Sequence, residues 1–257
     1  MDYKIVFFDV DGTLVNYEDG RISASTRRAL QVLKNKGIIL VAATGRPLSM
    51  CQSLKELGID TFITANGAYV KHQSQVIYKN ALTAETVQSM NAFALNNGQS
   101  LSFFTEELSM NGVQNATTLQ VLKETLSLQE YPSTIQEIAN QEVYLMCLYA
   151  DQQTEEKYKL QFPHLTFKRW HPYVMNVLER DVAKSIAVNK VLEYFNLEPH
   201  EAIAFGDGEN DIDMLEHVGV GIAMGNGHAS LKAVADFVTK KCTEDGIELA
   251  LQKLQLV

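Results

Sequence analysis

A short apolar run, Ile5–Phe8, is followed at once by the acidic segment DVDGT at residues 9–13. A run of this length between turn residues is typical of a buried strand, so the two aspartates stand where that strand ends. In open parallel sheets, ligands bind outside the carboxyl ends of the strands. Residues two apart in extended chain project from the same face, so Asp9 and Asp11 can reach one substrate. The segment therefore indicates a site for metal-assisted phosphoryl chemistry at a sheet edge.

Short apolar runs alternate with helical patterns at both ends of the chain, which predicts βαβ units and a parallel sheet. Further strands are expected at residues 38–43, 61–64, 202–205 and 218–223, with a short edge strand at 237–238. Ser23 is expected to cap a helix that ends near Lys36, before Gly37. The polar residues that follow four of the strands should share one end of the sheet; they are Asp9 and Asp11, Thr44, Asn66, and Asp207.

The middle of the chain has a different pattern. Helices are expected near residues 84–96, 116–126 and 152–161, among strands such as 143–149 and 174–178, which is a mixed α+β pattern. A chain of 257 residues is long for one core and short for two full ones. We therefore expect a core domain at residues 1–81 and 180–257, interrupted by an inserted domain at residues 82–179, with hinges near Asn80 and Arg180.

Four segments in order along the chain carry a family resemblance. FFDVDGTLV resembles the first motif of the haloacid dehalogenase (HAD) superfamily, and the other three motifs are matched by Thr44 in VAATGR, Lys184 in DVAKS, and Asp207 with Asp211 in GDGENDIDML. The segments TANGA and GIAMGNG add to the match. The chain is most similar to the Cof-type phosphatases, which have a C2B-type α+β cap between motifs two and three. The resemblance covers both ends of the chain well and the middle hardly at all.

The resemblance implies an α/β fold, with a Rossmann-like parallel-sheet core and an inserted α+β cap that reads the substrate. It implies a Mg²⁺-dependent phosphatase of small phosphorylated metabolites, such as sugar phosphates or phosphorylated cofactors. Asp9 would attack phosphorus to give an aspartyl-phosphate that water then hydrolyses. Asp11 would protonate the leaving oxygen and then activate that water.

The same resemblance assigns the remaining site residues. Mg²⁺ would be held by Asp9, the Asp11 carbonyl and Asp207, with Asp211 holding a metal-bound water or supporting the ligands. Thr44 would donate its hydroxyl to a phosphoryl oxygen, helped by the amides of Gly45 and Arg46 at a helix start, although a plain helix cap has the same geometry. Asn210 is expected to support the phosphate side of the site; Asn66 is expected either to contact the substrate or, with Gly67, only to shape a turn under the cap.

Lys184 stands in the first turn of a helix that should run to about Phe195. That is the unfavourable end of the helix dipole for a cation, so an anionic neighbour is expected. A transferring phosphoryl group and the Asp9 carboxylate would supply it.

Three other motifs fail on spacing. A calcium loop that starts at Asp9 needs Gly and Glu where Leu14 and Gly20 stand. A P-loop that ends at Lys184 needs glycines where Leu178 and Ala183 stand. The segment GNGHAS at residues 225–230 lacks the third glycine of a dinucleotide fingerprint and lies in the wrong βα turn.

The net charge and the cysteine content limit which partners this protein can bind and which cell compartment it can occupy. The net charge of −9 speaks against nucleic acids and anionic membranes, which are bound through clustered Lys and Arg. It also makes a bound cation useful, because carboxylates would otherwise repel a phosphorylated substrate. The three separated cysteines indicate reduced thiols and a cytoplasmic protein, and no apolar stretch approaches the roughly 20 residues that span a bilayer.

Two alternatives remain open from the motifs. A phosphomutase would use the same site to pass the phosphoryl group to another hydroxyl rather than to water. A regulatory module would bind phosphorylated ligands without turnover, although binding alone would not need both Asp9 and Asp11. The sequence identifies neither the substrate nor the oligomeric state.

Overall fold

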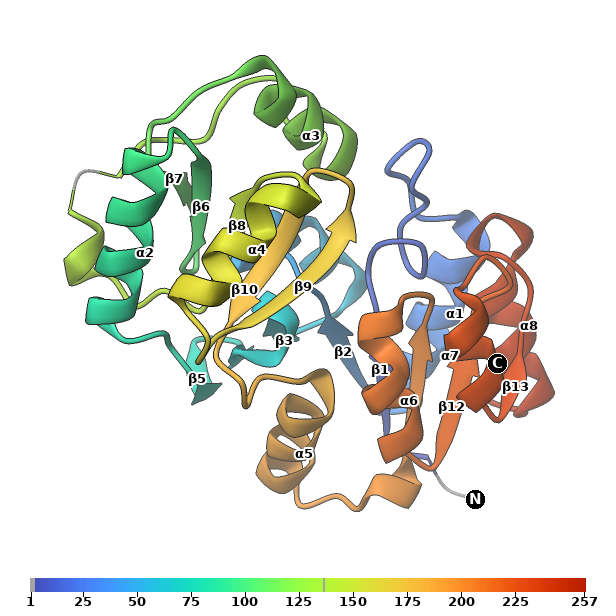
Figure 1. Ribbon diagram of the computed structural model, residues 1–257. Coiled ribbons are helices and arrows are strands. Elements are labelled where there is room, and N and C mark those ends of the chain that lie inside the picture. Colours follow the sequence, from blue (N-terminus) through green and yellow to red (C-terminus); the bar gives the residue numbers. More distant parts are fainter. Residues whose placement is uncertain (1–2, 136) are drawn as a thin grey trace. The chain divides into compact units, whose positions relative to one another are not determined.

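The computed structural model describes residues 3–135 and 137–257, which form two compact units (Figure 1). The first unit is built from the chain up to Arg46, from Met50–Lys79 and from Ala183–Val257. The second is built from Pro47–Ser49 and Asn80–Val182. None of the helices in the described part of the chain has the length and apolar character that a bilayer crossing requires.

The first unit contains an eight-stranded sheet. Its strands lie in the order β13 (Phe237–Val238), β12 (Val220–Ala223), β11 (Ala202–Gly206), β1 (Ile5–Phe8), β2 (Ile39–Ala43), β3 (Thr61–Thr64), β4 (Tyr69–His72) and β5 (Gln75–Lys79). Neighbours from β13 to β3 are parallel, so the parallel sheet and its six predicted strands are confirmed. The antiparallel pair β4 and β5 was not predicted, because half-exposed polar residues interrupt the apolar pattern of these strands.

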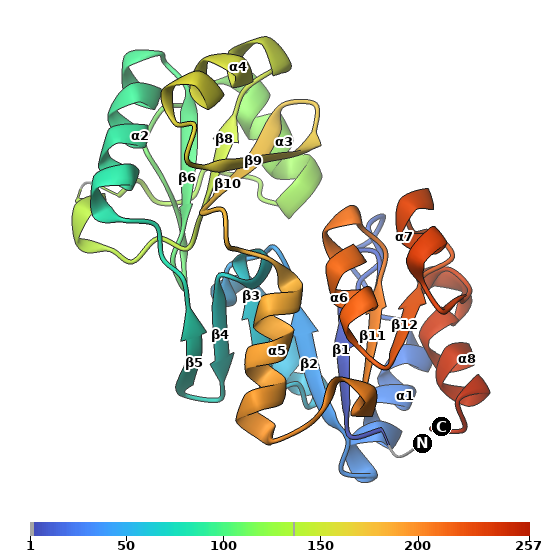
Figure 2. The same cartoon turned by 60° about the horizontal axis from the view of Figure 1, so that its bottom comes forward.

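Helices lie on both faces of this sheet (Figure 2). One face is covered by α5 (Lys184–Phe195), α6 (Ile212–His217) and α7 (Ala229–Val234), whose buried side chains join one apolar core with β1, β2 and β3. On the other face, α1 (Ala24–Asn35) contacts β2 and α8 (Gly246–Lys253). The hydroxyl of Ser23 accepts from the Thr26 amide at 3.1 Å and caps α1 as predicted. The helix ends just before Gly37, whose φ of +78° suits glycine.

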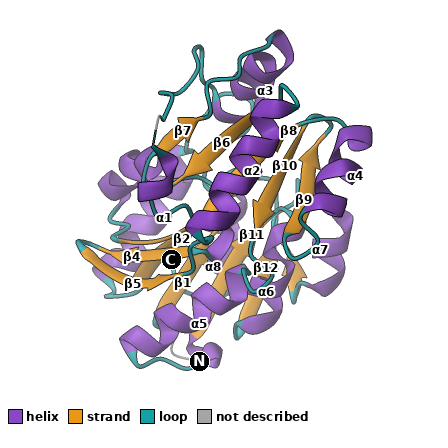
Figure 3. Ribbon diagram, turned by 60° about the vertical axis from the view of Figure 1, so that its left-hand side comes forward, coloured by secondary structure: helices purple, strands orange, loops and turns teal. Residues whose placement is uncertain are grey.

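The second unit has its own sheet, in which all neighbours are antiparallel (Figure 3). The strand order is β7 (Leu108–Met110), β6 (Ser100–Phe104), β8 (Leu145–Tyr149), β10 (Val174–Leu178) and β9 (Thr166–His171). Buried side chains of α2 (Ala84–Asn96) and α4 (Gln152–Gln161) pack on one face of it. The third helix, α3 (Ala116–Leu126), is linked to β6 by a hydrogen bond of 3.0 Å, which the Thr118 hydroxyl donates to the Ser100 hydroxyl. The α+β pattern and all three predicted helices are confirmed.

Candidate active site

The residues that the sequence placed after strands β1, β2, β3 and β11 meet at one edge of the first unit's sheet. The Asp9 amide donates to the Phe205 carbonyl at 2.9 Å, which joins the ends of β1 and β11. The Asn66 amide donates to the Thr44 carbonyl at 3.1 Å, which joins the loops after β2 and β3. The side chain of Asn210 then donates to Asn66 Oδ1 at 3.1 Å. Backbone and side chains together therefore bring the predicted positions to one place.

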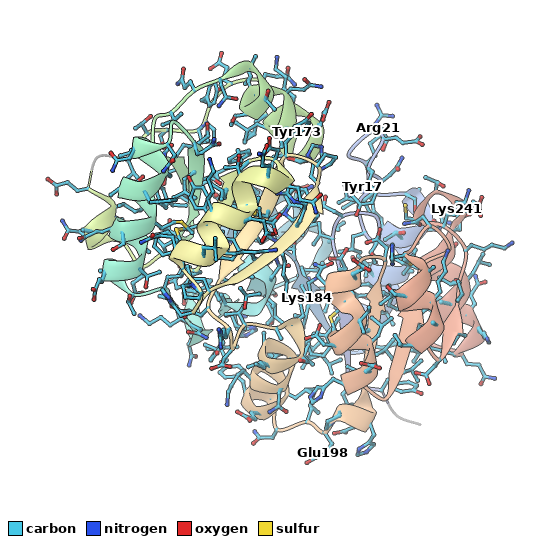
Figure 4. All side chains as sticks on the ribbon, viewed as in Figure 1. Tyr17, Arg21, Tyr173, Lys184, Glu198 and Lys241 are labelled. Carbon is cyan, nitrogen blue, oxygen red and sulfur yellow. The ribbon has the colours of Figure 1, made fainter. Side chains whose placement is uncertain are left out.

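Three buried carboxylates and one buried ammonium form the centre of this edge; we call Asp9, Asp207, Asp211 and Lys184 the buried cluster. One oxygen of each carboxylate lies within 4.8 Å of the others. Lys184, only 1% exposed at the start of α5, donates to Asp9 Oδ1 at 2.7 Å, to Asp211 Oδ1 at 2.5 Å and to the Ala43 carbonyl at 2.8 Å (Figure 4). Asp9 is the carboxylate expected beside this lysine, and Asp211, which was not expected there, is a second.

The charges in the buried cluster do not balance. Burial and the charge of Asp211 raise the pKa of Asp9 well above its ordinary value, despite Lys184. The same two causes raise the pKa of Asp207 to about 7. Burial alone would lower the pKa of Lys184, but Asp211 and Asp9 outweigh it and raise the pKa of the ammonium. One cation therefore serves three carboxylates, and the site favours additional positive charge.

This donor set fits a hard divalent cation. Mg²⁺ prefers oxygen ligands, and a bound cation makes the ionised form of neighbouring carboxyl groups more favourable. A metal would therefore replace the protons that burial otherwise favours on Asp9 and Asp207.

Asp211 supports the loop after β11. Its Oδ2 accepts from the amides of Asp207 at 3.0 Å and Gly208 at 2.9 Å, while its Oδ1 accepts from Lys184. A Cβ atom on Gly206 would lie 2.6 Å from the Asp211 Cβ, so the close fit of this loop requires glycine. Both Asp211 oxygens are engaged within the protein, which favours a role in holding the Asp207 loop and Lys184.

Asp11 lies in a more open environment and pairs with Arg46. The guanidinium donates from Nε to Asp11 Oδ2 at 2.8 Å and from NH2 to Oδ1 at 2.5 Å. The side chains are 32% exposed for Asp11 and 23% for Arg46. Burial opposes the charge of Arg46, but the hydrogen bond and charge of Asp11 outweigh it and raise the arginine pKa. The sequence predicted only the amide of Arg46 as a site group, so this ion pair was missed.

One sequence prediction about the loop after β2 is wrong. Gly45 and Arg46 do not begin a helix; they form a bend, and the next helical segment is a 3₁₀ stretch at Leu48–Leu57. Pro47 explains the difference, because a residue that precedes proline is driven out of the helical region. The buried Thr44 hydroxyl accepts from the Arg46 amide at 3.1 Å, so its proton remains available to an acceptor.

Two residues outside the predicted set also reach the buried cluster. The Asn226 side chain donates to the Gly12 carbonyl at 2.8 Å and to Asp207 Oδ2 at 3.4 Å. Tyr17 lies on the loop after β1 (Figure 4), and its Cε2 and Asp207 Oδ2 both lie within 2.3 Å of the point that a Cβ atom on Gly12 would occupy. Asn226 lies in the GIAMGNG segment, where its neighbours gave a signal, whereas nothing in the residue type or spacing of Tyr17 marked it.

Known proteins resemble this chain in sequence and fold along nearly all of its length. The family model of the haloacid dehalogenase-like hydrolases matches residues 6–251. The Bacillus subtilis (strain 168) protein named "Putative phosphatase YkrA" is 37% identical over 260 residues, covering 100% of both chains.

Two solved structures extend the comparison. A hypothetical protein from Geobacillus kaustophilus HTA426 is 36% identical with a TM-score of 0.92, covering 99% of this chain and 100% of its own. The HAD subclass IIB sugar phosphatase BT4131 is 35% identical with a TM-score of 0.85, covering the same shares. The chain therefore belongs to the haloacid dehalogenase-like hydrolases and is a phosphatase of that family.

Proposed function

We propose that this chain is a Mg²⁺-dependent phosphatase that hydrolyses small phosphorylated metabolites, sugar phosphates or phosphorylated cofactors, through an aspartyl-phosphate intermediate. The observation that carries the proposal is the contrast between two carboxylates at one sheet edge. Asp9 is buried against the Lys184 ammonium, whereas Asp11 is about one-third exposed beside Arg46. A fixed nucleophile and an accessible acid–base group are what a two-step phosphoryl transfer needs.

In the first step, an Asp9 carboxylate oxygen forms a bond to phosphorus while the bond between phosphorus and the ester oxygen breaks. Asp11 gives its proton to the departing oxygen, so the alcohol leaves neutral. Lys184 holds Asp9 Oδ1 and places positive charge beside the phosphoryl group. The Arg46 amide donates to the Thr44 hydroxyl, which keeps its own proton, so the Thr44 hydroxyl and the Gly45 amide would be donors to the phosphoryl oxygens.

In the second step, Asp11 takes a proton from water as the water oxygen attacks phosphorus. The bond from phosphorus to Asp9 breaks, inorganic phosphate leaves, and the proton remains on Asp11 for the next cycle. Arg46 binds both oxygens of Asp11, so Asp11 must leave this bidentate pair before it can carry a proton to the substrate. Substrate entry is the event that we expect to open the pair.

The metal would be held by the side chains of Asp9 and Asp207 and by the Asp11 carbonyl, with Asp211 holding the Asp207 loop. When bound, Mg²⁺ supplies positive charge that neutralises the phosphoryl oxygens and orients them. Asn66 and Asn210, linked to each other, would support the phosphate side of the site.

The second unit would be the cap that reads the rest of the substrate, since the residues proposed for chemistry all belong to the first unit. The relative BT4131 is described as a sugar phosphatase, which supports sugar phosphates as the first class to test. None of the three described cysteines, Cys51, Cys147 and Cys242, is in a disulfide bond, which supports our proposal of a reducing cytoplasm.

The test is release of inorganic phosphate from a panel of sugar phosphates and phosphorylated cofactors, with Mg²⁺, with EDTA, and with Ca²⁺ in place of Mg²⁺. Turnover should require Mg²⁺ and fail with Ca²⁺, whose looser coordination misplaces nucleophile and phosphate. Isomerised hexose phosphate without free phosphate would indicate a mutase. Binding across the panel without any turnover would indicate the regulatory module. Full activity after exhaustive chelation would contradict the metal requirement.

A further inference from the structure

The loop that follows β1 carries Tyr17 and is closely hydrogen-bonded. The Asn16 amide donates to the Arg21 carbonyl at 2.9 Å, and the Gly20 amide donates to the Asn16 carbonyl at 2.9 Å. The Asn16 side chain accepts from the Glu18 amide at 3.2 Å, on the other side of Tyr17. The backbone on both sides of Tyr17 is therefore held in place by short-range bonds.

The Tyr17 ring lies against the turn at Gly12, at the point where Asp207 also approaches. A Cβ atom on Gly12 would lie 2.3 Å from Tyr17 Cε2 and 2.1 Å from Asp207 Oδ2. Gly12 also has a φ of +82°, so both its conformation and the space around it require glycine. The missing side chain lets the ring and the carboxylate meet.

Apolar burial does not explain this position of the ring. Tyr17 is 66% exposed, the most exposed tyrosine among the large hydrophobic residues on the described surface. Its ring edge nevertheless lies beside the buried Asp207, since Tyr17 Cε2 and Asp207 Oδ2 both lie within 2.3 Å of the point that a Cβ atom on Gly12 would occupy. An exposed ring gains little from packing, so the contact with Asp207 is its distinctive interaction.

We propose that Tyr17 is a positioning residue of the metal site, whose phenol donates to Asp207 and fixes the carboxylate for metal binding. This inference rests on the proposed function, because Asp207 is a proposed Mg²⁺ ligand. The side-chain amide of Asn226 also donates to this carboxylate, at 3.4 Å from Asp207 Oδ2. Hydrogen bonds to ligating carboxylates orient them, and loss of such a partner commonly weakens metal affinity by roughly 10- to 100-fold.

The test is Mg²⁺ binding to the substrate-free protein, measured by isothermal titration calorimetry for the wild type and for Tyr17→Phe. The substitution keeps the ring and removes only the hydroxyl. We expect the Mg²⁺ affinity to fall by about 10-fold. Tyr173→Phe is the matched control, since Tyr173 is also an exposed tyrosine but lies in the second unit; the Mg²⁺ affinity of this variant should equal that of the wild type.

A second measurement separates positioning from a structural role. The Mg²⁺ concentration that gives half-maximal phosphate release should rise for Tyr17→Phe, while kcat at saturating Mg²⁺ and the melting temperature should stay near the wild-type values. Unchanged Mg²⁺ affinity would overturn the proposal, and so would tighter binding, which would mean that the phenol competes with the metal. If the wild type itself bound no Mg²⁺, the metal-dependent function would fail together with this inference; a wild type that binds Mg²⁺ and an unaffected variant would reject the inference alone.

Discussion

Asp9 and Asp11 are two residues apart in the sequence and lie in opposite environments. Asp9 belongs to the buried cluster, where Lys184 contacts it and two further carboxylates lie nearby. Asp11 is one-third exposed and pairs with Arg46 at the edge of the site. Neighbouring carboxyl groups with different surroundings are a recurring means of separating a nucleophile from an acid–base group. Burial, more than residue type, therefore distinguishes the roles that we propose for Asp9 and Asp11.

The two environments also differ in whether water can compensate a charged side chain that loses its partner. In the buried cluster, ionised groups are removed from water, so the loss of one partner leaves an uncompensated charge that is costly. At the Asp11–Arg46 pair, water can replace a lost partner, and the side chains can separate at small cost. The roles that we propose follow the same division, because an attacking group must be fixed and a proton carrier must exchange with substrate and water.

The largest effect should come from the nucleophile. Asp9→Asn cannot form an acyl-phosphate, so turnover should fall by on the order of 10⁴-fold or more. Phosphate release under saturating substrate measures this, and trapping of a phosphorylated protein should succeed only with the wild type. Turnover near the wild-type rate would rule out the covalent mechanism and remove the distinction between Asp9 and Asp11.

The acid–base side should show a smaller loss that depends on the leaving group. Asp11→Asn should slow steady-state turnover by roughly 10²- to 10⁴-fold, the usual contribution of general acid–base catalysis. Alkyl phosphates need a proton on the leaving oxygen more than p-nitrophenyl phosphate does. If both substrates slowed equally, Asp11 could not be the group that protonates the leaving oxygen.

Stability should separate the two regions even without substrate. Lys184→Met removes the ammonium from the buried cluster and should lower the free energy of unfolding by about 3–5 kcal/mol. Arg46→Gln should cost at most about 1 kcal/mol, because its pair is partly solvated. Lys190→Met, on the same helix as Lys184 but on the surface, is the matched control and should behave like Arg46→Gln. Urea denaturation of the metal-free proteins measures all three, and equal losses for Lys184→Met and Arg46→Gln would contradict the comparison.

Much of the site was predictable because its residues follow strand ends. Apolar runs locate β1, β2, β3 and β11, and a parallel sheet then brings their next residues to one edge. Asp11 and Arg46 are 35 residues apart in the sequence, so no local pattern predicts that their side chains form an ion pair. The contact of Tyr17 with Asp207 depends on the shape of a loop and on the space above Gly12. The bend at Gly45 and Arg46 was predictable from Pro47, because a residue that precedes proline is disfavoured in the helical conformation.

The smallest effect should be a pH dependence of stability that belongs to the buried cluster alone. Burial and Asp211 raise the pKa of Asp207 to about 7, above the ordinary aspartate value near 3.8 that applies in the unfolded chain. Between these pH values Asp207 binds more protons in the folded, metal-free protein than in the unfolded chain, so the contribution of this group to stability is present at low pH and is lost as the pH rises through about 7. One group can contribute at most about 1.4 kcal/mol per pH unit to this slope. Thermal unfolding in EDTA at pH 5, 6 and 7 measures it; the decline should shrink in Asp207→Asn and in the presence of Mg²⁺. An Asp207→Asn variant with the wild-type slope would show that this carboxyl does not hold a proton in the folded state, and the cluster would then lack the excess negative charge that distinguishes it from the Asp11–Arg46 pair.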